Sequence, residues 1–365
     1  MKRITFFINS LSSGGAEHQL AVLANFLNEC NYDITVATIS NTHDYYTLDN
    51  NIKRACVGRY KNKILKLLSI WRYFISVDTD CVIIFCQRNS FFALPAMWTR
   101  SRKKVKVICG ERNLTVDSQD IMEKVLFCFL YKRADYIVPN SHSQGRYILE
   151  KAPWLKTKLV PIINYTSLDL YRYHEQPQNS IIIIGVFCRY EKQKNCIGFI
   201  NAIKKIKEQS HLDFQVHWFG SKKFGNPDLQ NYYDQILKII QEYKLERTVI
   251  LNDAVKNVSE IMASCDAICI PSFFEGFSNA ISEAICCGRP VLCSDVSDNC
   301  LMVQNNRNGY LFNPYNIDSI VDAFLSFFSL SQGERSIMGK NSRIIASKMF
   351  NKDRFVNSYI NLIEN

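Results

Sequence analysis

Two carboxylates eight residues apart stand in a segment whose residue types suit the binding of a phosphorylated sugar. Glu275 and Glu283 flank a Gly-Phe-Ser-Asn loop, and the apolar run 267–270 precedes them. The run predicts a strand, Ser278 is a typical helix cap, and residues 280–287 have apolar helical character. A helix that begins near Ser278 presents unpaired backbone N–H groups, which favour an anion such as a pyrophosphate.

The two glutamates are predicted to hold opposite ends of one nucleotide-sugar donor. Glu275 would lie on the loop beside the reacting sugar, and Glu283, about one turn into the helix, would reach the vicinal diol of a ribose. The alternative is a pair of solvated glutamates around a helix cap. The eight-residue spacing, the Glu-Gly-Phe sequence and the Cys-Gly-Arg-Pro-Val exit occur together, which favours the donor site. The other donor-binding residues are predicted to be Gly276, Phe277, Ser278 and Asn279.

Arg189 and Lys194 are the cations expected to stabilise the leaving diphosphate. They follow the predicted strand 181–187. Arginine offers a bidentate fork and lysine a compact charge, and positive side chains can stabilise a departing phosphate without a metal ion. A solvated turn is the alternative, because Glu191 and Lys192 are close by.

Two loops of the N-terminal half also follow predicted strands. Gly14 and Gly15 would let the backbone approach the sugar or diphosphate of the donor, although a glycine pair also fits a plain turn. The G-x-G-x-x-G pattern is absent there, which argues against an NAD-dependent dehydrogenase or epimerase that uses this loop. Glu111 and Arg112 follow the predicted strand 105–109 and are candidates to orient the acceptor or the donor sugar, with a surface salt bridge as the alternative.

The segment 271–290 resembles the E-x7-E signature of the family 4 retaining glycosyltransferases, which have the GT-B fold and use nucleotide-activated sugars. Other segments resemble the family's glycine-rich first loop, its strand that ends in serine, its G-R-x4-K element and its N-G-x-L motif. These segments are residues 4–17, 137–141, 189–195 and 308–314. The resemblance covers nearly the whole chain. It implies a retaining, metal-independent transferase with Glu275, Arg189 and Lys194 as catalytic residues and no cofactor beside the nucleotide sugar.

The chain departs from the family pattern at four places. Cys188 stands where a glycine usually precedes the arginine, and Asp253 stands where a glycine is common. Residues 294–299 lack the usual Gly-Gly of their loop, and residues 111–113 read Glu-Arg-Asn where many relatives carry a histidine.

A metal-binding alternative comes from residues 78–80, which read Asp-Thr-Asp. A D-x-D triplet holds a divalent metal and the sugar nucleotide in glycosyltransferases of the GT-A fold. The triplet directly precedes the apolar run 81–85, so we expect it to cap a helix and open a strand. We predict no metal site.

Alternating strand-like and helix-like stretches predict an α/β protein with two Rossmann-like domains, each a mostly parallel sheet covered by helices. Strands are expected at residues 4–8, 34–39, 81–85, 105–109, 136–138, 181–187, 214–219, 249–251, 267–270 and 291–293, and helices at 17–28, 64–77, 122–133, 196–208, 229–243, 258–263 and 280–287. In the GT-B arrangement that the resemblance implies, residues 1–168 bind the acceptor and 169–348 bind the donor across a cleft. Residues 349–365 form a helix that returns to the first domain.

Positive charge is concentrated in the N-terminal half. Residues 1–175 hold 24 Lys and Arg against 15 Asp and Glu, a net of +9 out of +10 for the chain. The segment 59–74 combines basic residues with apolar residues at roughly helical spacing, and 100–106 is also basic. Segment 59–74 fits a helix that lies on an anionic membrane surface or, equally, one that packs on its own sheet. Nucleic acid is not an expected partner, because no recognition module accompanies the charge.

Composition indicates a globular cytoplasmic protein. Peripheral binding to the inner face of the cytoplasmic membrane is compatible with this location. The 365 residues are 47% hydrophobic, and the 14 cysteines show no C-x2-C pair. No signal peptide is evident, and no apolar run approaches the ~18 to 20 residues of a spanning helix. Cys265 and Cys269 lack histidine partners at zinc-ligand spacing, so we expect them to be small buried residues.

The combined prediction is a retaining glycosyltransferase that moves a sugar, expected to be UDP-linked, to a saccharide or lipid-linked glycan in the synthesis of a surface polysaccharide such as capsule, lipopolysaccharide or O-antigen. Two alternatives stay open. A nucleotide-sugar 2-epimerase of similar fold would convert the donor without an acceptor. A noncatalytic partner subunit would bind the nucleotide sugar without turnover.

Overall fold

The computed structural model describes residues 1–12, 14–40, 44–100, 104–112, 121–210 and 212–365. The described chain forms two compact units, one of Met1–Tyr165 with Lys352–Asn365 and the other of Thr166–Asn351. The chain therefore leaves the first unit after Tyr165 and re-enters it at Lys352, where the sequence suggested crossings after residues 168 and 348.

The first unit is built on six parallel strands in the order β3-β2-β1-β4-β5-β6. Both faces of the sheet are covered, so the central strands are apolar along their whole length. The strands are β1 (Arg3–Ile8), β2 (Asp33–Thr38), β3 (Lys53–Cys56), β4 (Cys81–Phe85), β5 (Lys106–Glu111) and β6 (Tyr136–Pro139).

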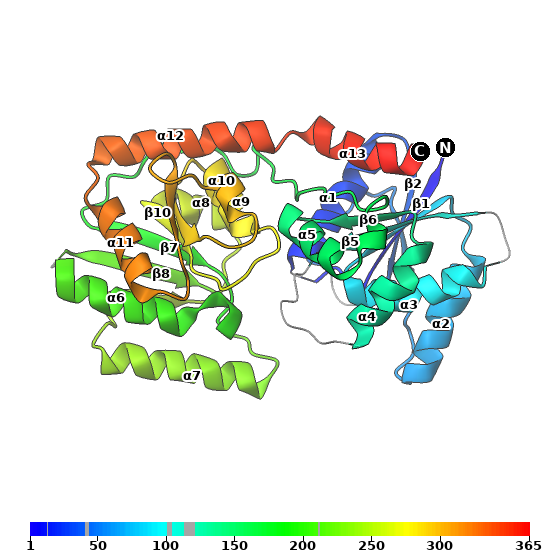
Figure 1. Ribbon diagram of the computed structural model, residues 1–365, viewed down its shortest axis with the longest axis horizontal. Helices are drawn as coiled ribbons and strands as arrows, with labels where there is room; N and C mark the ends of the chain where they lie inside the picture. The colour runs from blue at the N-terminus through cyan, green and yellow to red at the C-terminus, as the bar shows by residue number, and fades with distance from the viewer. Residues whose placement is uncertain (13, 41–43, 101–103, 113–120, 211) are drawn as a thin grey trace. The chain divides into compact units, whose positions relative to one another are not determined.

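Two cores lie on opposite faces of this sheet, because successive side chains of a strand point to opposite sides. Phe6 and Phe85 belong to the core beneath α1 and α13, whereas Phe7 and Ile84 belong to the core beneath α2, α3, α4 and α5. The terminal helix α13 thus completes the first unit (Figure 1). The helices are α1 (Gly15–Glu29), α2 (Lys63–Ser76), α3 (Gln87–Trp98), α4 (Ile121–Cys128), α5 (His142–Lys151) and α13 (Lys352–Glu364), with short 3-10 turns η1 (Leu130–Arg133) and η2 (Pro153–Leu155).

The second unit repeats this plan with the strand order β12-β11-β10-β7-β8-β9, again all parallel. Its strands are β7 (Ile182–Phe187), β8 (Phe214–Phe219), β9 (Val249–Asn252), β10 (Ala267–Ile270), β11 (Val291–Ser294) and β12 (Gly309–Phe312). Its helices are η3 (Lys192–Lys194), α6 (Cys196–Ser210), α7 (Pro227–Glu242), α8 (Val258–Ser264), α9 (Asn279–Cys286), α10 (Asn299–Met302), α11 (Ile317–Phe328) and α12 (Gln332–Met349). From β7 the strands that follow in the sequence continue to one side of the sheet, and from β10 they continue to the other side. Sheets of α/β proteins commonly bind ligands at such a switch between adjacent strands.

The elements without a counterpart in the sequence prediction are the strands β3 and β12 and the helices α3, α5, α10, α11 and α12, besides short 3-10 turns, and one expected helix is divided. Strand β3 is a short edge strand with exposed Lys53 and Arg54, and helix α3 contains Pro95, so neither carries a clean apolar pattern. Strand β12 has only four residues. The helix expected at 122–133 ends at Cys128 and continues as the separate turn η1.

Candidate functional site

The predicted cation Lys194 and the predicted carboxylate Glu275 form an ion pair at the carboxyl edge of the second sheet. Lys194 Nζ lies 2.7 Å from Glu275 Oε1, and the two side chains are only 12% and 11% exposed. Burial opposes the charged form of Lys194, but the attraction of Glu275 outweighs it and raises the lysine pKa above its ordinary value. The lysine therefore carries its charge at neutral pH. Its three N–H donors allow one ammonium to serve both the glutamate and a phosphate oxygen.

The turn η3 holds Lys194 in place from both sides. Asn195 takes a left-handed conformation with φ of 53°, and its side chain donates a hydrogen bond to the Pro314 carbonyl at 3.0 Å. Gln193 donates to the Phe274 carbonyl at 3.0 Å, and its own carbonyl accepts from the Phe273 N–H at 2.9 Å. The turn after β7 and the loop after β10 are thus joined directly.

Two serines fix Glu275, and the sequence analysis singled out neither. Ser272 Oγ donates to Glu275 Oε1 at 2.7 Å, and the Glu275 N–H donates to Ser297 Oγ at 3.3 Å. Ser297 lies in the loop 294–299 that lacks the expected glycine pair, yet it takes a φ of 54°, the region that glycine ordinarily occupies. The absence of the two glycines marked this loop as unusual in the sequence, but only the fold shows that its serine contacts Glu275.

The second glutamate, Glu283, lies half-buried on helix α9, and Ser278 occupies the N-cap position of that helix. Burial raises the pKa of Glu283 to about 7, and a hydrogen bond with Tyr171 counteracts part of the rise. The loop before the helix includes the buried side chain of Phe277, which packs edge-on against Phe350. Gly276 and Asn279 lie in the same loop and first helical turn.

Two arginines hold the segment that carries Tyr171 against helix α9. Arg343 donates from Nη1 to the carbonyls of Tyr171 and Cys286 at 3.0 and 2.7 Å. Arg289 is fully buried and donates to the carbonyls of His174 and Glu175, the latter at 2.9 Å. Gly288 precedes it with a φ of 72°, which ends the helix. The Cys-Gly-Arg-Pro sequence therefore ends helix α9 and anchors the segment that carries Tyr171.

Arg189 differs from Lys194 in its environment. It follows β7 as predicted, but its side chain is 68% exposed and Arg189 Nη1 lies 2.9 Å from Glu191 Oε1. The structure thus brings Lys194 and Glu275 into contact and pairs Arg189 with a neighbouring acid.

The predicted glycines of the first loop lie at the start of helix α1, which follows β1. Gly14 is the N-cap residue with an extended φ of −170°, and it has no side-chain cap. A Cβ there would meet the carboxylate of Glu17. Gly15 is the first residue of the helix. A role of this pair in donor binding stays a prediction.

Glu111 and Arg112 form buried contacts inside the first unit, where a surface salt bridge was the alternative. The Tyr131 hydroxyl donates to Glu111 Oε1, and Arg112 donates to Asn164 Oδ1 at 3.1 Å and to the Tyr359 hydroxyl at 2.7 Å. Burial raises the pKa of Glu111 to about 8, with repulsion from Glu123 adding to the rise and Arg112 opposing it. Asn113, the third residue of that motif, lies outside the described residues.

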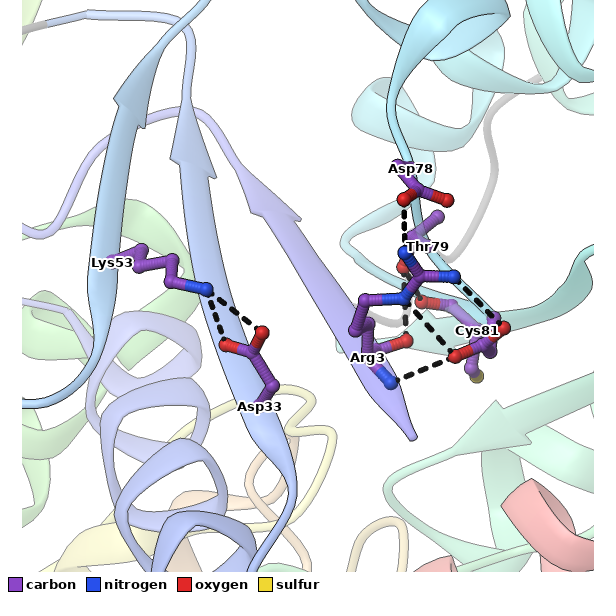
Figure 2. Close-up of polar contacts among 7 residues, drawn as sticks. Arg3, Asp33, Lys53, Asp78, Thr79 and Cys81 are labelled. Carbon is purple, nitrogen blue, oxygen red and sulfur yellow. Dashed lines mark hydrogen bonds and ion pairs between the residues drawn. The ribbon is translucent and has the colours of Figure 1, made fainter. Parts of the chain in front are cut away.

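The Asp-Thr-Asp triplet binds an arginine in this fold. Asp78 pairs with Arg3, and Asp80 Oδ2 accepts from the Arg3 backbone N–H at 2.9 Å (Figure 2). Thr79 Oγ1 donates to the carbonyls of Arg3 and Cys81 at 3.0 and 2.9 Å. The triplet therefore ties the amino ends of β1 and β4 together, at the edge of the sheet opposite the carboxyl ends.

Three further features concern metal binding, membrane spans and the cysteines. Within the described ranges, no group of three or more His, Cys, Asp or Glu side chains is placed to hold a metal ion. Among the same residues, no helix combines the length and apolarity that crossing a bilayer requires. All fourteen cysteines lie in the described part of the chain and are free thiols, with Cys265 and Cys269 buried as expected.

The second unit is similar to a known protein family. Residues 173–344 match the family model of glycosyl transferases group 1. Over this segment the chain is similar to the group 1 glycosyl transferases. The matched segment contains the whole Lys194–Glu275 site and Glu283, so the predicted assignment to a family of transferases is confirmed.

Similarity to individual proteins extends over most of this glycosyltransferase. It is 26% identical to the N-acetylgalactosamine-N,N'-diacetylbacillosaminyl-diphospho-undecaprenol 4-alpha-N-acetylgalactosaminyltransferase of Campylobacter jejuni, over 81% of either chain. It is 22% identical to the amylovoran biosynthesis glycosyltransferase AmsD of Erwinia amylovora, also over 81% of either chain. The crystal structure of Anabaena HepE in complex with UDP-glucose superposes with a TM-score of 0.84 at 17% identity, over 100% of both chains. The predicted GT-B fold is confirmed.

Proposed function

We propose that this glycosyltransferase moves a hexose-type sugar from a UDP-linked donor to a saccharide or lipid-linked glycan during synthesis of a bacterial surface polysaccharide, such as capsule or O-antigen. The buried contact between Lys194 and Glu275 supports the proposal, because these are the side chains that we propose to bind the phosphate and to orient the sugar. The names of the relatives support the substrate classes: one contains diphospho-undecaprenol, and the HepE structure is a complex with UDP-glucose.

In the proposed reaction, the bond between the anomeric carbon and the diphosphate oxygen breaks with retention of configuration. Lys194 and Arg189 stabilise the charge that develops on the leaving diphosphate, and Glu275 orients the sugar. The acceptor hydroxyl oxygen attacks the anomeric carbon and its proton passes to the departing phosphate oxygen. Because these side chains supply the positive charge, we propose that the step requires no metal and no cofactor.

Donor recognition is assigned to helix α9 and its preceding loop. The N–H groups of the first helical turn favour the diphosphate, and the Ser278 side chain makes no cap hydrogen bond. Glu283 binds the ribose diol through its carboxylate. Gly276, Phe277 and Asn279 complete the loop around the donor, and Gly14 and Gly15 are proposed to contribute backbone contacts from the first unit.

We further propose that the first unit binds the anionic surface of the cytoplasmic membrane through helix α2. Ile70 and Phe74 of this helix are buried, whereas Ile64, Leu67 and Leu68 are exposed. The segment 59–74 contains five basic and no acidic residues. Exposed leucines beside lysines are typical of helices that lie in a lipid interface. Residues 101–103 of the second basic segment lie outside the described residues.

The test is a transfer assay with the purified full chain, UDP-, GDP- and ADP-sugars, and free or undecaprenyl-diphosphate-linked saccharides as acceptors. We expect transfer from a UDP-sugar, an α-linked product from an α-linked donor, and full activity in EDTA. Loss of activity in EDTA that Mn²⁺ restores would overturn metal independence. Donor conversion without acceptor would identify an epimerase, and UDP binding without turnover would identify a binding subunit.

A further inference from the structure

A cavity of about 510 Å³ lies within the second unit, beside the turn that carries Lys194. It is bounded by that turn and by the first turns of helix α7. Besides Lys192, six of its lining residues have polar side chains: Glu191, Gln193, Asp228, Asn231, Tyr232 and Gln235. Its volume falls in the range of ordinary small-molecule sites.

The chemistry of this lining indicates the class of ligand. The lining contains two carboxylates, three amides and one phenol, and Leu229 is its single aliphatic residue. Glu191 already pairs with Arg189 and Gln193 with the Phe274 carbonyl, whereas an apolar ligand would face the Asp228 carboxylate and the amides of Asn231 and Gln235. A phosphate group would meet the carboxylates of Glu191 and Asp228, and Lys192 is the one cation of the lining. A neutral ring with many hydroxyl groups offers both donors and acceptors to amides and carboxylates. The ligand class that fits is therefore an uncharged saccharide.

The cavity adjoins the donor site through two of its lining residues, and its lining does not include Lys194, Glu275 or Glu283. Glu191 lines it and also pairs with Arg189 at 2.9 Å. Gln193 lines it and also bonds the loop before Glu275 through its side chain and its carbonyl. A sugar held there would contact two residues that position the proposed catalytic groups.

We propose that this cavity is a saccharide subsite of the enzyme, separate from the donor-binding residues. The proposal rests on the proposed glycosyl transfer for the identity of the ligand, an uncharged sugar unit of a glycan acceptor or product. Asp228 and Asn231 from α7 and Gln193 from η3 bind its hydroxyl groups, and Tyr232 forms part of the wall.

The test measures binding of glucose, galactose, N-acetylglucosamine, N-acetylgalactosamine and N,N'-diacetylchitobiose to the full chain by saturation-transfer NMR and calorimetry. We expect at least one probe to bind with a dissociation constant on the order of millimolar. Asn231→Trp fills the cavity from an exposed position and should weaken that binding by about tenfold or more. Gln230→Trp, the adjacent exposed residue that does not line the cavity, should leave it within about twofold.

A second pair of variants, which introduces no tryptophan, controls for disruption of the helix. Asp228→Asn should weaken saccharide binding, and Asp234→Asn on the same helix should not. Absence of saturable binding by every probe, or equal weakening in cavity and control variants, would overturn the subsite. UDP binding to the unaltered chain tests the proposed function separately. If the chain binds no UDP but binds a sugar that Asn231→Trp weakens, the subsite is supported and the donor assignment is wrong.

Discussion

Lys194 Nζ and Glu275 Oε1 lie 2.7 Å apart although 81 residues separate them in the sequence. Each residue follows a strand of the second sheet, Lys194 after β7 and Glu275 after β10, and these strands are hydrogen-bonded neighbours. Parallel strands end at the same edge of a sheet, so the pairing of β7 with β10 brings the two loops together. Gln193 then joins the loops through two hydrogen bonds.

The first prediction concerns the leaving-group cation. Lys194→Ala should lower kcat for sugar transfer ~100- to 1,000-fold, because the developing charge on the diphosphate loses a buried donor. The change also leaves Glu275 without its cation, so thermal unfolding must be measured in parallel. Lys204→Ala, a half-exposed lysine of α6, is the control and should retain activity. Near-normal transfer by the Lys194 variant would contradict the assignment.

The second prediction is a pH dependence of donor affinity. With a Glu283 pKa of about 7, the carboxylate that binds the ribose diol becomes protonated as the pH falls from about 8 to about 6, and UDP affinity should drop roughly tenfold. Glu283→Gln should bind UDP weakly with no such dependence over the same interval. Calorimetric titration of UDP at several pH values measures both. A pH-independent affinity in the unaltered chain would contradict the role of this carboxylate.

The same raised pKa has a consequence for stability. A carboxyl whose folded pKa lies above its unfolded value contributes most below the unfolded pKa, and this contribution is lost as the pH rises through about 7. Glu283→Gln should therefore have a higher Tm than the unaltered chain at pH 8 and a smaller difference at pH 5. Calorimetric unfolding at the two pH values tests the sign.

The fourth prediction separates structure from chemistry at Glu111. Because its pKa of about 8 leaves it largely protonated at neutral pH, Glu111→Gln should change the free energy of unfolding by less than about 1 kcal/mol. Glu111→Ala removes the partner of the buried Tyr131 hydroxyl and should cost about 1–3 kcal/mol. Denaturant unfolding measures both. A stable Gln variant with strongly reduced transfer would support the predicted role of Glu111 in orienting a substrate.

The fifth prediction concerns membrane binding by helix α2. Replacing Ile64 and Leu68 with Gln should reduce co-sedimentation with vesicles that contain phosphatidylglycerol, since both side chains are exposed, at 69% and 52%. Added salt should reduce the binding of the unaltered chain, because the lysines contribute through screened charge. Ile344→Gln, an exposed residue of α12, is the control. Equal binding to neutral and anionic vesicles would contradict the proposed surface.

The sequence by itself determined the alternation of strands and helices, the parallel sheets, and the placement of Glu275, Glu283, Arg189 and Lys194 after or within predictable elements. These features follow from local periodicity and capping, which neighbouring residues specify. It could not specify β3 or α3, whose charged residues and internal proline mask the pattern.

Only the tertiary structure decided which of these residues meet. Arg189 is 68% exposed and pairs with Glu191, while Lys194 is buried against Glu275 in the loop after β10. The fold also brought Ser272 and Ser297 to Glu275 and Tyr171 to Glu283. Contacts of this kind depend on strand order and burial, and both are set by long-range packing that sequence spacing does not encode.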